Sequence, residues 1–149
     1  MASIRSVLAI DPGKNGGVAI VNRSGKVKVK RCPSDNDPFK MANIIKKMTR
    51  RYKHIQIIIE KVWAFPTDSA MTSFKFGTNF GIWLGILGTM GLPYRKVTPQ
   101  TWQKVYQPLS KEKKERKNQL KTIAKDFYEK ATLNTSDAIL MAIWGIKNV

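Results

Sequence analysis

The order of short hydrophobic runs along the chain constrains its fold more than any other feature. Residues 6–10 (SVLAI) and 16–21 (GGVAIV) are apolar runs separated by a turn sequence, and residues 26–30 (KVKVK) alternate strictly between valine and lysine. Short runs of this kind, separated by glycine, proline and asparagine, predict a meander of three strands. Because strand side chains alternate between faces, the valines of the third run should face inward and the lysines outward.

A helix followed by a further strand is predicted next. Residues 39–51 place Met41, Ile44, Ile45 and Met48 at the spacing of one helical face. Residues 55–59 (IQIII) then form a run rich in β-branched side chains, ending on Glu60. A strand, a helix and a strand in succession predict a right-handed crossover, which would lay this fourth strand parallel to a strand already in the sheet.

The second half of the chain is predicted to be mainly helical. Asp68 or Thr67 should cap a long helix running to about Met90, and residues 93–97 should add a fifth strand. Helices are then predicted to begin at Thr98-Pro99 and to span residues 111–130 and 136–146. The whole pattern predicts an α/β fold, a mixed five-stranded sheet with helices on both faces, in one domain covering residues 1–149.

Charge points to a polyanionic partner. The formal net charge is +17 over 149 residues, which favours nucleic acid first and an anionic membrane surface second. With Cys32 as the only cysteine there is neither an internal disulfide nor a zinc cluster. No signal peptide is recognisable, and residues 77–94 are too short and glycine-rich for a membrane span. We therefore expect a soluble intracellular protein with no membrane partner.

Three acids stand out because acidic side chains are scarce, ten against twenty-seven basic ones. Asp11 and Glu60 each end a hydrophobic strand, and if those strands are neighbours their backbones lie roughly 5 Å apart. Asp137 opens the apolar C-terminal helix. Three carboxylates could hold Mg²⁺ or Mn²⁺, and two such ions about 4 Å apart would support phosphodiester hydrolysis. The pattern indicates a metal-dependent nuclease.

Each acid also has a simpler interpretation. Asp11-Pro-Gly is common turn chemistry, Glu60 could be an exposed strand end, and Asp137 could complement a helix dipole. The three acids in conjunction, beside a strong basic excess, favour the catalytic interpretation.

The sequence resembles the RuvC-type Holliday junction resolvases, most closely their compact phage and chloroplast members. The segments that carry the resemblance follow one another in order along nearly the whole chain: 8–20 (LAIDPGKNGGVAI), 57–62 (IIIEKV) leading into Phe65, 75–81 (KFGTNFG), 117–120 (KNQL) and 136–142 (SDAILMA). The resemblance implies an RNase H-like fold, a homodimer, and Mg²⁺-dependent paired incisions in the two like-polarity strands of a four-way DNA junction. The resemblance implies a protein of the bacterial cytoplasm, encoded by the bacterium or by a phage. An organelle or a viral factory is the alternative location.

By resemblance, Asp11, Glu60 and Asp137 match three metal-binding acids of the family, and Lys117 matches a lysine near the scissile phosphate. Asn134 stands where the family usually has a fourth acid. Its amide would hold a divalent cation more weakly. Three alternatives stay open: the chain uses another acid, tolerates asparagine, or binds the junction but cleaves it poorly. We expect Asn134→Asp to keep or raise cleavage.

Several basic and aromatic residues are predicted to contact DNA. The predicted contacts are Lys14, Phe65, Lys75, Lys111, Lys113, Lys114, Arg116, Lys117 and Lys121. The simpler interpretation of residues 111–117 is a solvated helix face on which Glu112 and Glu115 pair with Arg116 and other bases. For most of these lysines we favour phosphate contact. Trp63 and Phe65 could stack on unpaired bases, with Phe65 as the wedge, or could close the core.

Glycines at positions 77, 81 and 85 fall on one face of the predicted long helix. They could pack this helix on the sheet, or form a dimer contact to which Ile82, Trp83 and Ile86 add apolar area. We favour the dimer contact, because a symmetric junction requires two symmetric sites.

Other functions remain open from the sequence. A nuclease for other branched DNA or for RNA:DNA hybrids would show the same acids and charge, and a non-catalytic junction binder is compatible with Asn134. The turn after the first strand also resembles a sugar-kinase or actin-like phosphate loop, but 149 residues are too few for two such domains. No small-molecule cofactor is expected.

Overall fold

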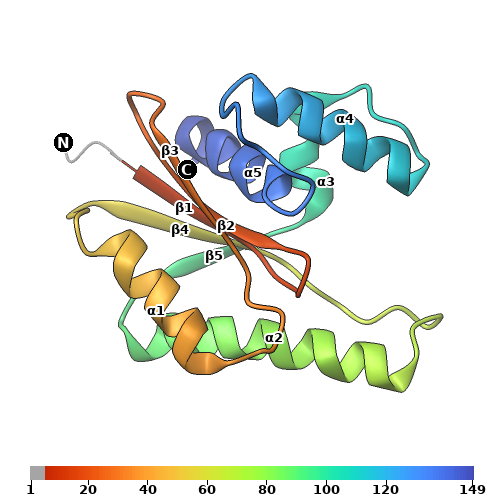
Figure 1. The fold of residues 1–149 in the computed structure, drawn as a ribbon, viewed down its shortest axis with the longest axis horizontal. Helices are drawn as coiled ribbons and strands as arrows, with labels where there is room; N and C mark the ends of the chain where they lie inside the picture. The colour runs from red at the N-terminus through yellow and green to blue at the C-terminus, as the bar shows by residue number, and fades with distance from the viewer. Residues whose placement is uncertain (1–5) are drawn as a thin grey trace.

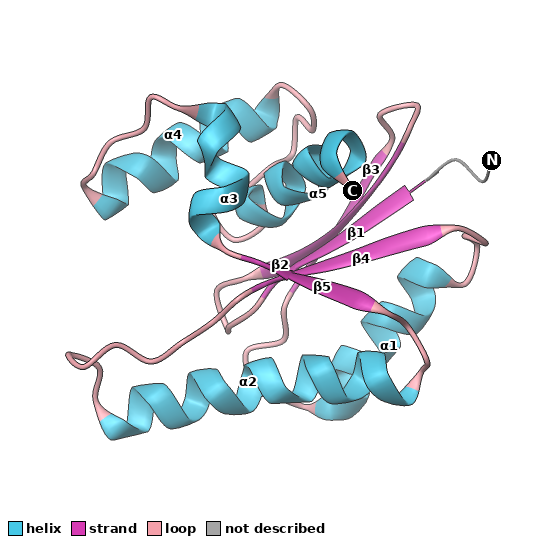
Figure 2. Cartoon of the chain, turned by 180° about the vertical axis from the view of Figure 1, so that it is seen from behind, coloured by secondary structure: helices cyan, strands magenta, loops and turns pink. Residues whose placement is uncertain are grey.

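The computed structural model describes residues 6–149 and shows a five-stranded sheet between two layers of helices (Figures 1 and 2). The elements in chain order are β1 Ser6–Asp11, β2 Gly17–Asn22, β3 Val27–Arg31, α1 Pro38–Thr49, β4 Ile55–Glu60, α2 Ala70–Thr89, β5 Tyr94–Val97, α3 Pro99–Gln103, the 3₁₀ turn Lys104–Tyr106, α4 Lys113–Lys125 and α5 Ser136–Asn148. The predicted strands are all present, with ends that shift by one or two residues.

The sheet is mixed, as predicted. Its strand order is β3-β2-β1-β4-β5. Strand β2 is antiparallel to both β1 and β3, β4 is parallel to β1, and β5 is parallel to β4. The crossover through α1 makes β4 parallel to a strand already in the sheet, as predicted, and that strand is β1. Both strands run in the same direction, so their carboxyl ends meet at one edge of the sheet.

Each face of the sheet has its own apolar core. On one face Val7, Ala9 and Ile58 pack against α5, which carries a nearly continuous buried run, with α3 and α4 outside it. On the other face Leu8 and Ile10 pack against α1 and α2. In both views α4 and α5 lie on one side of the sheet and α1 and α2 on the other (Figures 1 and 2).

The edge strand β3 shows the predicted alternation. Val29 pairs with Ala19 and Lys30 with Val18, so the valines face the α5 core and the lysines face the opposite side, towards α1. The valines are half-buried and the lysines exposed.

The predicted ends of two helices were wrong. Helix α2 is capped by Ser69, whose Oγ accepts a hydrogen bond from the Thr72 N–H at 3.0 Å, and not by Thr67 or Asp68. Asp68 instead accepts from the Phe65 N–H at 2.9 Å and so closes a turn in the preceding loop. Helix α4 is shorter than the predicted 111–130, because the Glu112 carboxylate caps its start and the chain turns after Lys125.

None of the helices in residues 6–149 combines the length and the hydropathy needed to cross a bilayer.

Helix α5 approaches the sheet most closely at Gly145. A Cβ atom there would lie 2.8 Å from Val7 Cγ1 and 3.2 Å from Ile58 Cδ1. Both neighbours are fully buried β-branched side chains that cannot swing away. The missing side chain thus sets the distance between α5 and β1, and with it the position of Asp137 relative to Asp11.

Gly145→Ala is expected to destabilise the fold by about 1–3 kcal/mol through overpacking. Gly88→Ala is the matched control, because a Cβ at this helical glycine meets nothing within 4 Å. Thermal unfolding of both variants checks the prediction. Equal midpoints for the two variants would contradict it.

Candidate active site at the carboxyl ends of β1 and β4

The three predicted acids lie together at one edge of the sheet. Asp11 is the last residue of β1 and Glu60 the last of β4, one step beyond the paired residues Ile10 and Ile59. Asp137 enters from the other direction, in the first turn of α5, the helix that covers this end of β1 and β2. Asp11 and Asp137 are 8% and 4% exposed, so neither is an ordinary surface carboxylate.

These acids raise one another's proton affinity. Burial, followed by the nearby charges of Asp137 and Glu60, raises the pKa of Asp11 well above its usual range. Burial also raises the pKa of Glu60 to about 7, a shift that Asp137 reinforces and that the Trp102 hydrogen bond and Lys117 oppose. The site is therefore short of positive charge.

Among the described residues, Lys117 is the one cation that forms an ion pair with any of the three acids. Its Nζ donates to Asp137 Oδ2 at 2.5 Å from the middle of α4. Burial works to lower the pKa of Lys117, but the charges of Asp137, Asp11 and Glu60 and the hydrogen bond raise it overall. The lysine is thus held in its charged form among the acids.

A buried tryptophan orients Glu60. Trp102 is fully buried in α3, and its indole Nε1–H donates to Glu60 Oε2 at 2.7 Å. The sequence analysis missed this role, because nothing in the segment Thr98–Trp102 indicates which side chain its tryptophan meets.

Asn79 holds the turn that follows Asp11. The Gly13 N–H donates to Asn79 Oδ1 at 2.7 Å, and Asn79 Nδ2 donates to Asn36 Oδ1 at 2.8 Å. Gly13 has φ +112°, a conformation that favours glycine, and Asn79 is 2% exposed. A buried asparagine in an apolar helix was the available signal for this role, and the sequence analysis assigned Asn79 none.

Asn134 lies beside the same turn. Its Nδ2 donates to the Asn15 backbone carbonyl at 2.9 Å, and its own carbonyl lies where a Cβ on Gly17 would collide with it. A carboxylate cannot donate such a bond. Asn134→Asp would therefore remove a hydrogen bond that holds the turn and add a negative charge beside it.

The chemistry of the site fits a hard divalent cation. Asp137 Oδ1 is buried without a hydrogen-bond partner, and an orphaned carboxylate oxygen calls for a cation or a donor. All candidate ligands are oxygens, which suits Mg²⁺ or Mn²⁺ and not zinc. In the side-chain positions seen, no three His, Cys, Asp or Glu residues among residues 6–149 form a closed metal-ligating group. Lys117 and Trp102 each engage one of the carboxylates.

Cys32 lies beneath the site without a chemical role of its own. Its Sγ–H donates to the Asp11 backbone carbonyl at 3.4 Å. Burial, and then the charge of Asp11, raise the pKa of this thiol, so it stays protonated.

The predicted DNA-contacting lysines lie on both sides of the acids. Lys14 follows Asp11 in the β1–β2 turn, Lys75 is exposed on α2, and Lys111, Lys113, Lys114 and Lys121 lie at or along α4. Arg116 is already engaged, since its guanidinium donates to the Ser110 and Lys111 carbonyls. The pairing of Glu112 and Glu115 with Arg116, part of the simpler interpretation, is not seen: Glu112 caps the helix and Glu115 accepts from Ser110.

Two aromatic side chains extend from the loop after β4. Trp63 and Phe65 are 41% and 55% exposed, and their ring centroids lie 5.8 Å apart. The alternative that they close the core was wrong.

The glycine face of α2 is open. A Cβ on Gly77, Gly81 or Gly85 would meet nothing within 4 Å, so this face does not pack on the sheet. Trp83, predicted to contribute to a dimer contact, is instead fully buried beneath α2 in the core it shares with α1. Ile82 and Ile86 remain half-exposed.

Comparison with known proteins gives a fold but no sequence relative. No protein-family model matches the chain, and no curated protein sequence matches it. Among solved structures it is similar to the RuvC of T. thermophilus in complex with a Holliday junction substrate, with a TM-score of 0.65 at 15% identity over 93% of this chain and 91% of that one. It is also similar to a Thermus thermophilus RuvC structure with a TM-score of 0.64 at 16% identity, over 93% of this chain and 92% of that one. The chain thus has the RuvC, RNase H-like fold.

The coupled acids predict an unusual pH dependence of stability without metal. The folded-state pKa of Glu60 lies above its unfolded value, so the folded protein binds more protons and its stability should fall as pH rises from about 5 to 8. Glu60→Gln keeps an acceptor for Trp102 but cannot titrate, so it should flatten this slope. Urea unfolding in chelator at several pH values checks it. The electrostatic account would be contradicted if the stability of the wild type rose across this pH range. It would also be contradicted if Glu60→Gln left the dependence of stability on pH unaltered.

Proposed function

We propose that residues 1–149 form a structure-selective endonuclease domain that resolves four-way DNA junctions by metal-dependent phosphodiester hydrolysis. The observation that carries this proposal is the convergence of Asp11, Glu60 and Asp137 with Lys117 at one edge of an RNase H-like sheet. The net charge of +17 supports a nucleic-acid substrate. The choice of a junction rests on the similarity to a RuvC solved with a Holliday junction.

In this proposal Asp11, Glu60 and Asp137 hold Mg²⁺ or Mn²⁺, two ions per site. Such ions, when bound, activate a water and stabilise the departing 3′ oxygen. Trp102 fixes the Glu60 carboxylate, and Asn79 fixes the turn after Asp11, so two of the three acids are oriented from outside the site.

Lys117 has two roles in the proposal. Without substrate it neutralises part of the acid cluster through Asp137. With DNA present, its ammonium group can donate to a phosphate oxygen and stabilise the charge that develops there. Its side chain is 36% exposed, so it is accessible from solvent while it contacts the acids.

Contacts around the acids would position the DNA. Lys14, Lys75 and the exposed lysines of α4 contact phosphates, which fixes orientation without reading sequence. Phe65, beside Trp63, would stack on a base unpaired at the branch point.

A homodimer would present two such sites. The open glycine face of α2 adjoins a hollow of about 500 Å³ between α1 and α2. Its lining is mostly apolar: Pro38, Phe39, Ala42, Lys46, Ile82, Gly85, Ile86, Thr89 and Met90. Phe39 is 85% exposed beside it, which is costly for an isolated chain. A second copy packed on this face would cover these side chains.

The proposed function is tested with labelled four-way junction, linear duplex and RNA:DNA hybrid, each with Mg²⁺, Mn²⁺ or chelator. We expect metal-dependent, symmetric nicks in the junction only, and a loss of at least 10³-fold in rate for Asp11→Asn. Asp126→Asn, an exposed acid at the end of α4, is the control and should cut normally.

Other outcomes point to the alternatives. Cleavage of the hybrid or of other branched DNA in preference would indicate a different RNase H-like nuclease. Junction binding without cleavage in either metal would indicate a non-catalytic binder.

The dimer is tested by Gly81→Arg. An arginine fits on the isolated chain, because nothing lies within 4 Å of a Cβ there, but it would place charge in the proposed interface. We expect this variant to sediment as a monomer with an unchanged far-UV circular dichroism spectrum. It should nick the two strands of a junction independently and not as a pair. If the variant remains a dimer, the interface does not include this face of α2.

A further inference from the structure

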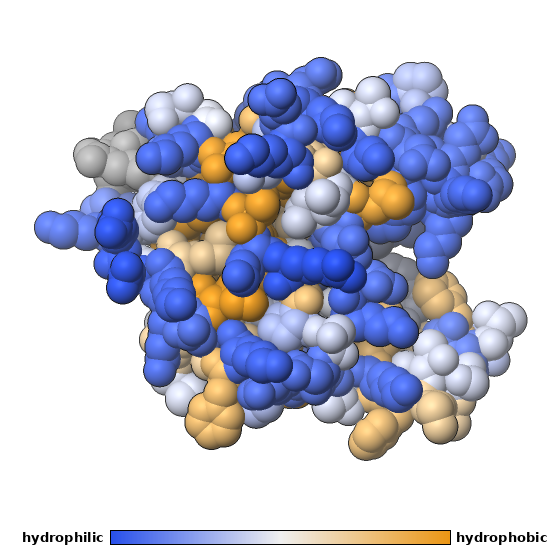
Figure 3. All heavy atoms as spheres, viewed as in Figure 1, coloured by the Kyte–Doolittle hydropathy of each residue, from blue (hydrophilic) through white to orange (hydrophobic). Residues whose placement is uncertain are grey.

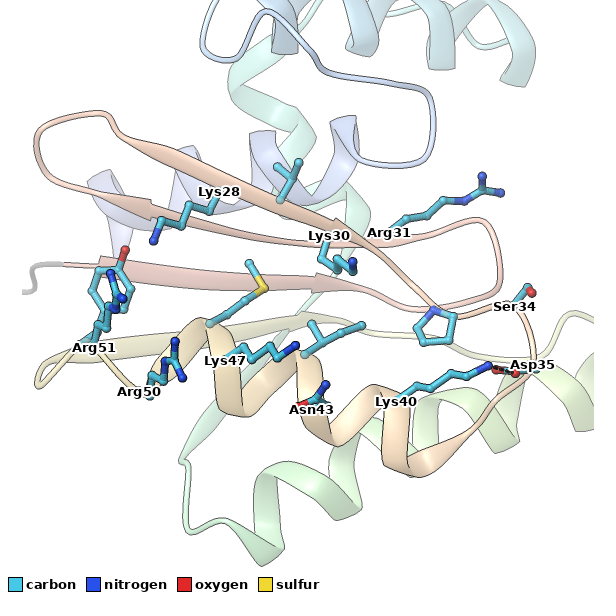
Figure 4. Close-up of a pocket in the computed structure, with 15 residues that line it drawn as sticks. Lys28, Lys30, Arg31, Ser34, Asp35, Lys40, Asn43, Lys47, Arg50 and Arg51 are labelled. Carbon is cyan, nitrogen blue, oxygen red and sulfur yellow. Dashed lines mark hydrogen bonds and ion pairs between the residues drawn. The ribbon is translucent and has the colours of Figure 1, made fainter.

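A second basic surface lies away from the acids, between β3 and α1. Here the structure has a groove of about 720 Å³, drawn in Figure 4. Lys28 and Lys30 of β3 form one wall, and Lys47 and Arg50, at the end of α1, lie on the other (Figure 4). None of the predicted DNA contacts lines it.

The groove exists because α1 leaves the edge of the sheet uncovered. Register pairs Lys28 with Ile20 and Lys30 with Val18, so both lysines stand on the face that α1 covers elsewhere. Half-buried Met48 and buried Ile44 of α1 form part of its floor. Figure 3 shows that this face of the molecule is dominated by hydrophilic side chains, with apolar atoms visible between them.

Positive charge in the groove is almost unopposed. Asp35 is the only acid that lines it, and Asp35 is paired with Lys40 at 2.5 Å. Among residues 6–149, no carboxylate lies within ion-pair distance of the other basic residues that line it: Lys28, Lys30, Arg31, Lys47, Arg50 and Arg51. So many like charges along two walls repel one another unless an anion separates them.

The lining favours a phosphate backbone over a peptide or over unstacked bases. None of the exposed large apolar side chains of residues 6–149 lines the groove, so it offers no anchoring pocket for a peptide. Its one aromatic residue, Tyr52, is half-buried and provides no stacking platform. Lys28 and Lys30, two residues apart on a strand, advance roughly 6.6 Å, which suits successive contacts along an extended polyanion.

One end of the groove lies near the edge of the sheet that holds the acids. Arg31, at the end of β3, pairs in register with Gly17, which pairs with Asp11 on the next strand. The loop after β3 reaches Asn79 through Asn36, and Asn79 holds the turn after Asp11. A duplex running from the acids along this side of the sheet would therefore meet the groove.

We propose that the groove between β3 and α1 binds the sugar–phosphate ridge of a duplex arm of the substrate, outside the incised segment. The proposal rests on the proposed function, since it assumes a branched DNA substrate. Contacts of this kind hold the arm without reading its sequence. The acids and α4 would then engage the branch point while the groove fixes the direction of one arm.

The test compares two triple variants that each remove three positive charges. Lys30→Gln, Lys47→Gln and Arg50→Gln neutralise both walls, while Lys104→Gln, Lys130→Gln and Lys147→Gln remove exposed charges outside the groove. Junction binding in chelator is titrated at several salt concentrations. We expect the groove variant to bind about tenfold more weakly or worse, with a salt slope shallower by about 2–3, and the control to match wild type.

The outcomes separate this proposal from the proposed function. Equal effects in both triple variants, with wild type binding and cutting junctions, would overturn the groove proposal alone. A wild type that neither binds nor cuts a junction would overturn both.

A measurement on the wild-type chain keeps the test independent of variant folding. Junction DNA should protect Lys28, Lys30 and Lys47 from acetylation, read by mass spectrometry, and leave Lys130 and Lys147 reactive. Equal protection of both sets, or none in the groove, would overturn the proposal.

Discussion

The charge balance among three carboxylates and one lysine organises the edge of the sheet at which β1 and β4 end. Asp11 and Asp137 lie almost out of solvent, burial raises the pKa of Asp11 and of Glu60, and Lys117 alone contacts the cluster as a cation within the described residues. Such an arrangement is costly for folding and useful for binding cations, because every carboxylate oxygen left without a donor favours a metal. The surrounding structure holds the acids in place against this repulsion.

That support comes from elements far apart in sequence. The parallel pairing of β1 with β4 aligns Asp11 and Glu60, and the close approach of α5 at Gly145 brings in Asp137. Trp102 and Asn79 then fix the carboxylate of Glu60 and the turn after Asp11. DNA would be held on both sides of this edge, by α4 on one face of the sheet and by the β3–α1 groove on the other.

The strands, their mixed order and the three acids could be predicted from local patterns, because strand alternation, β-branched runs and an acid after a buried run are visible in the sequence. Helix ends were less predictable: Ser69, Thr67 and Asp68 all have capping side chains, and only the folded backbone selects Ser69. The partners of Trp102 and Asn79 could not be predicted, since they lie 42 and 66 residues away. An asparagine inside an apolar helix marked Asn79 as unusual but not what it holds. Trp83 was misplaced because a glycine-rich, uniformly apolar helix hides which of its faces is buried.

The central claim, that Lys117 stands in for cations at an acid cluster, is tested most directly by the free energy of unfolding of Lys117→Met with and without Mg²⁺. Removing the lysine leaves Asp137 buried without a charge partner, so the variant should lose roughly 1–3 kcal/mol in chelator. It should recover much of this loss in saturating Mg²⁺, and gain more from the metal than wild type does. A variant as stable as wild type in chelator, or one that Mg²⁺ stabilises no further, would contradict the account.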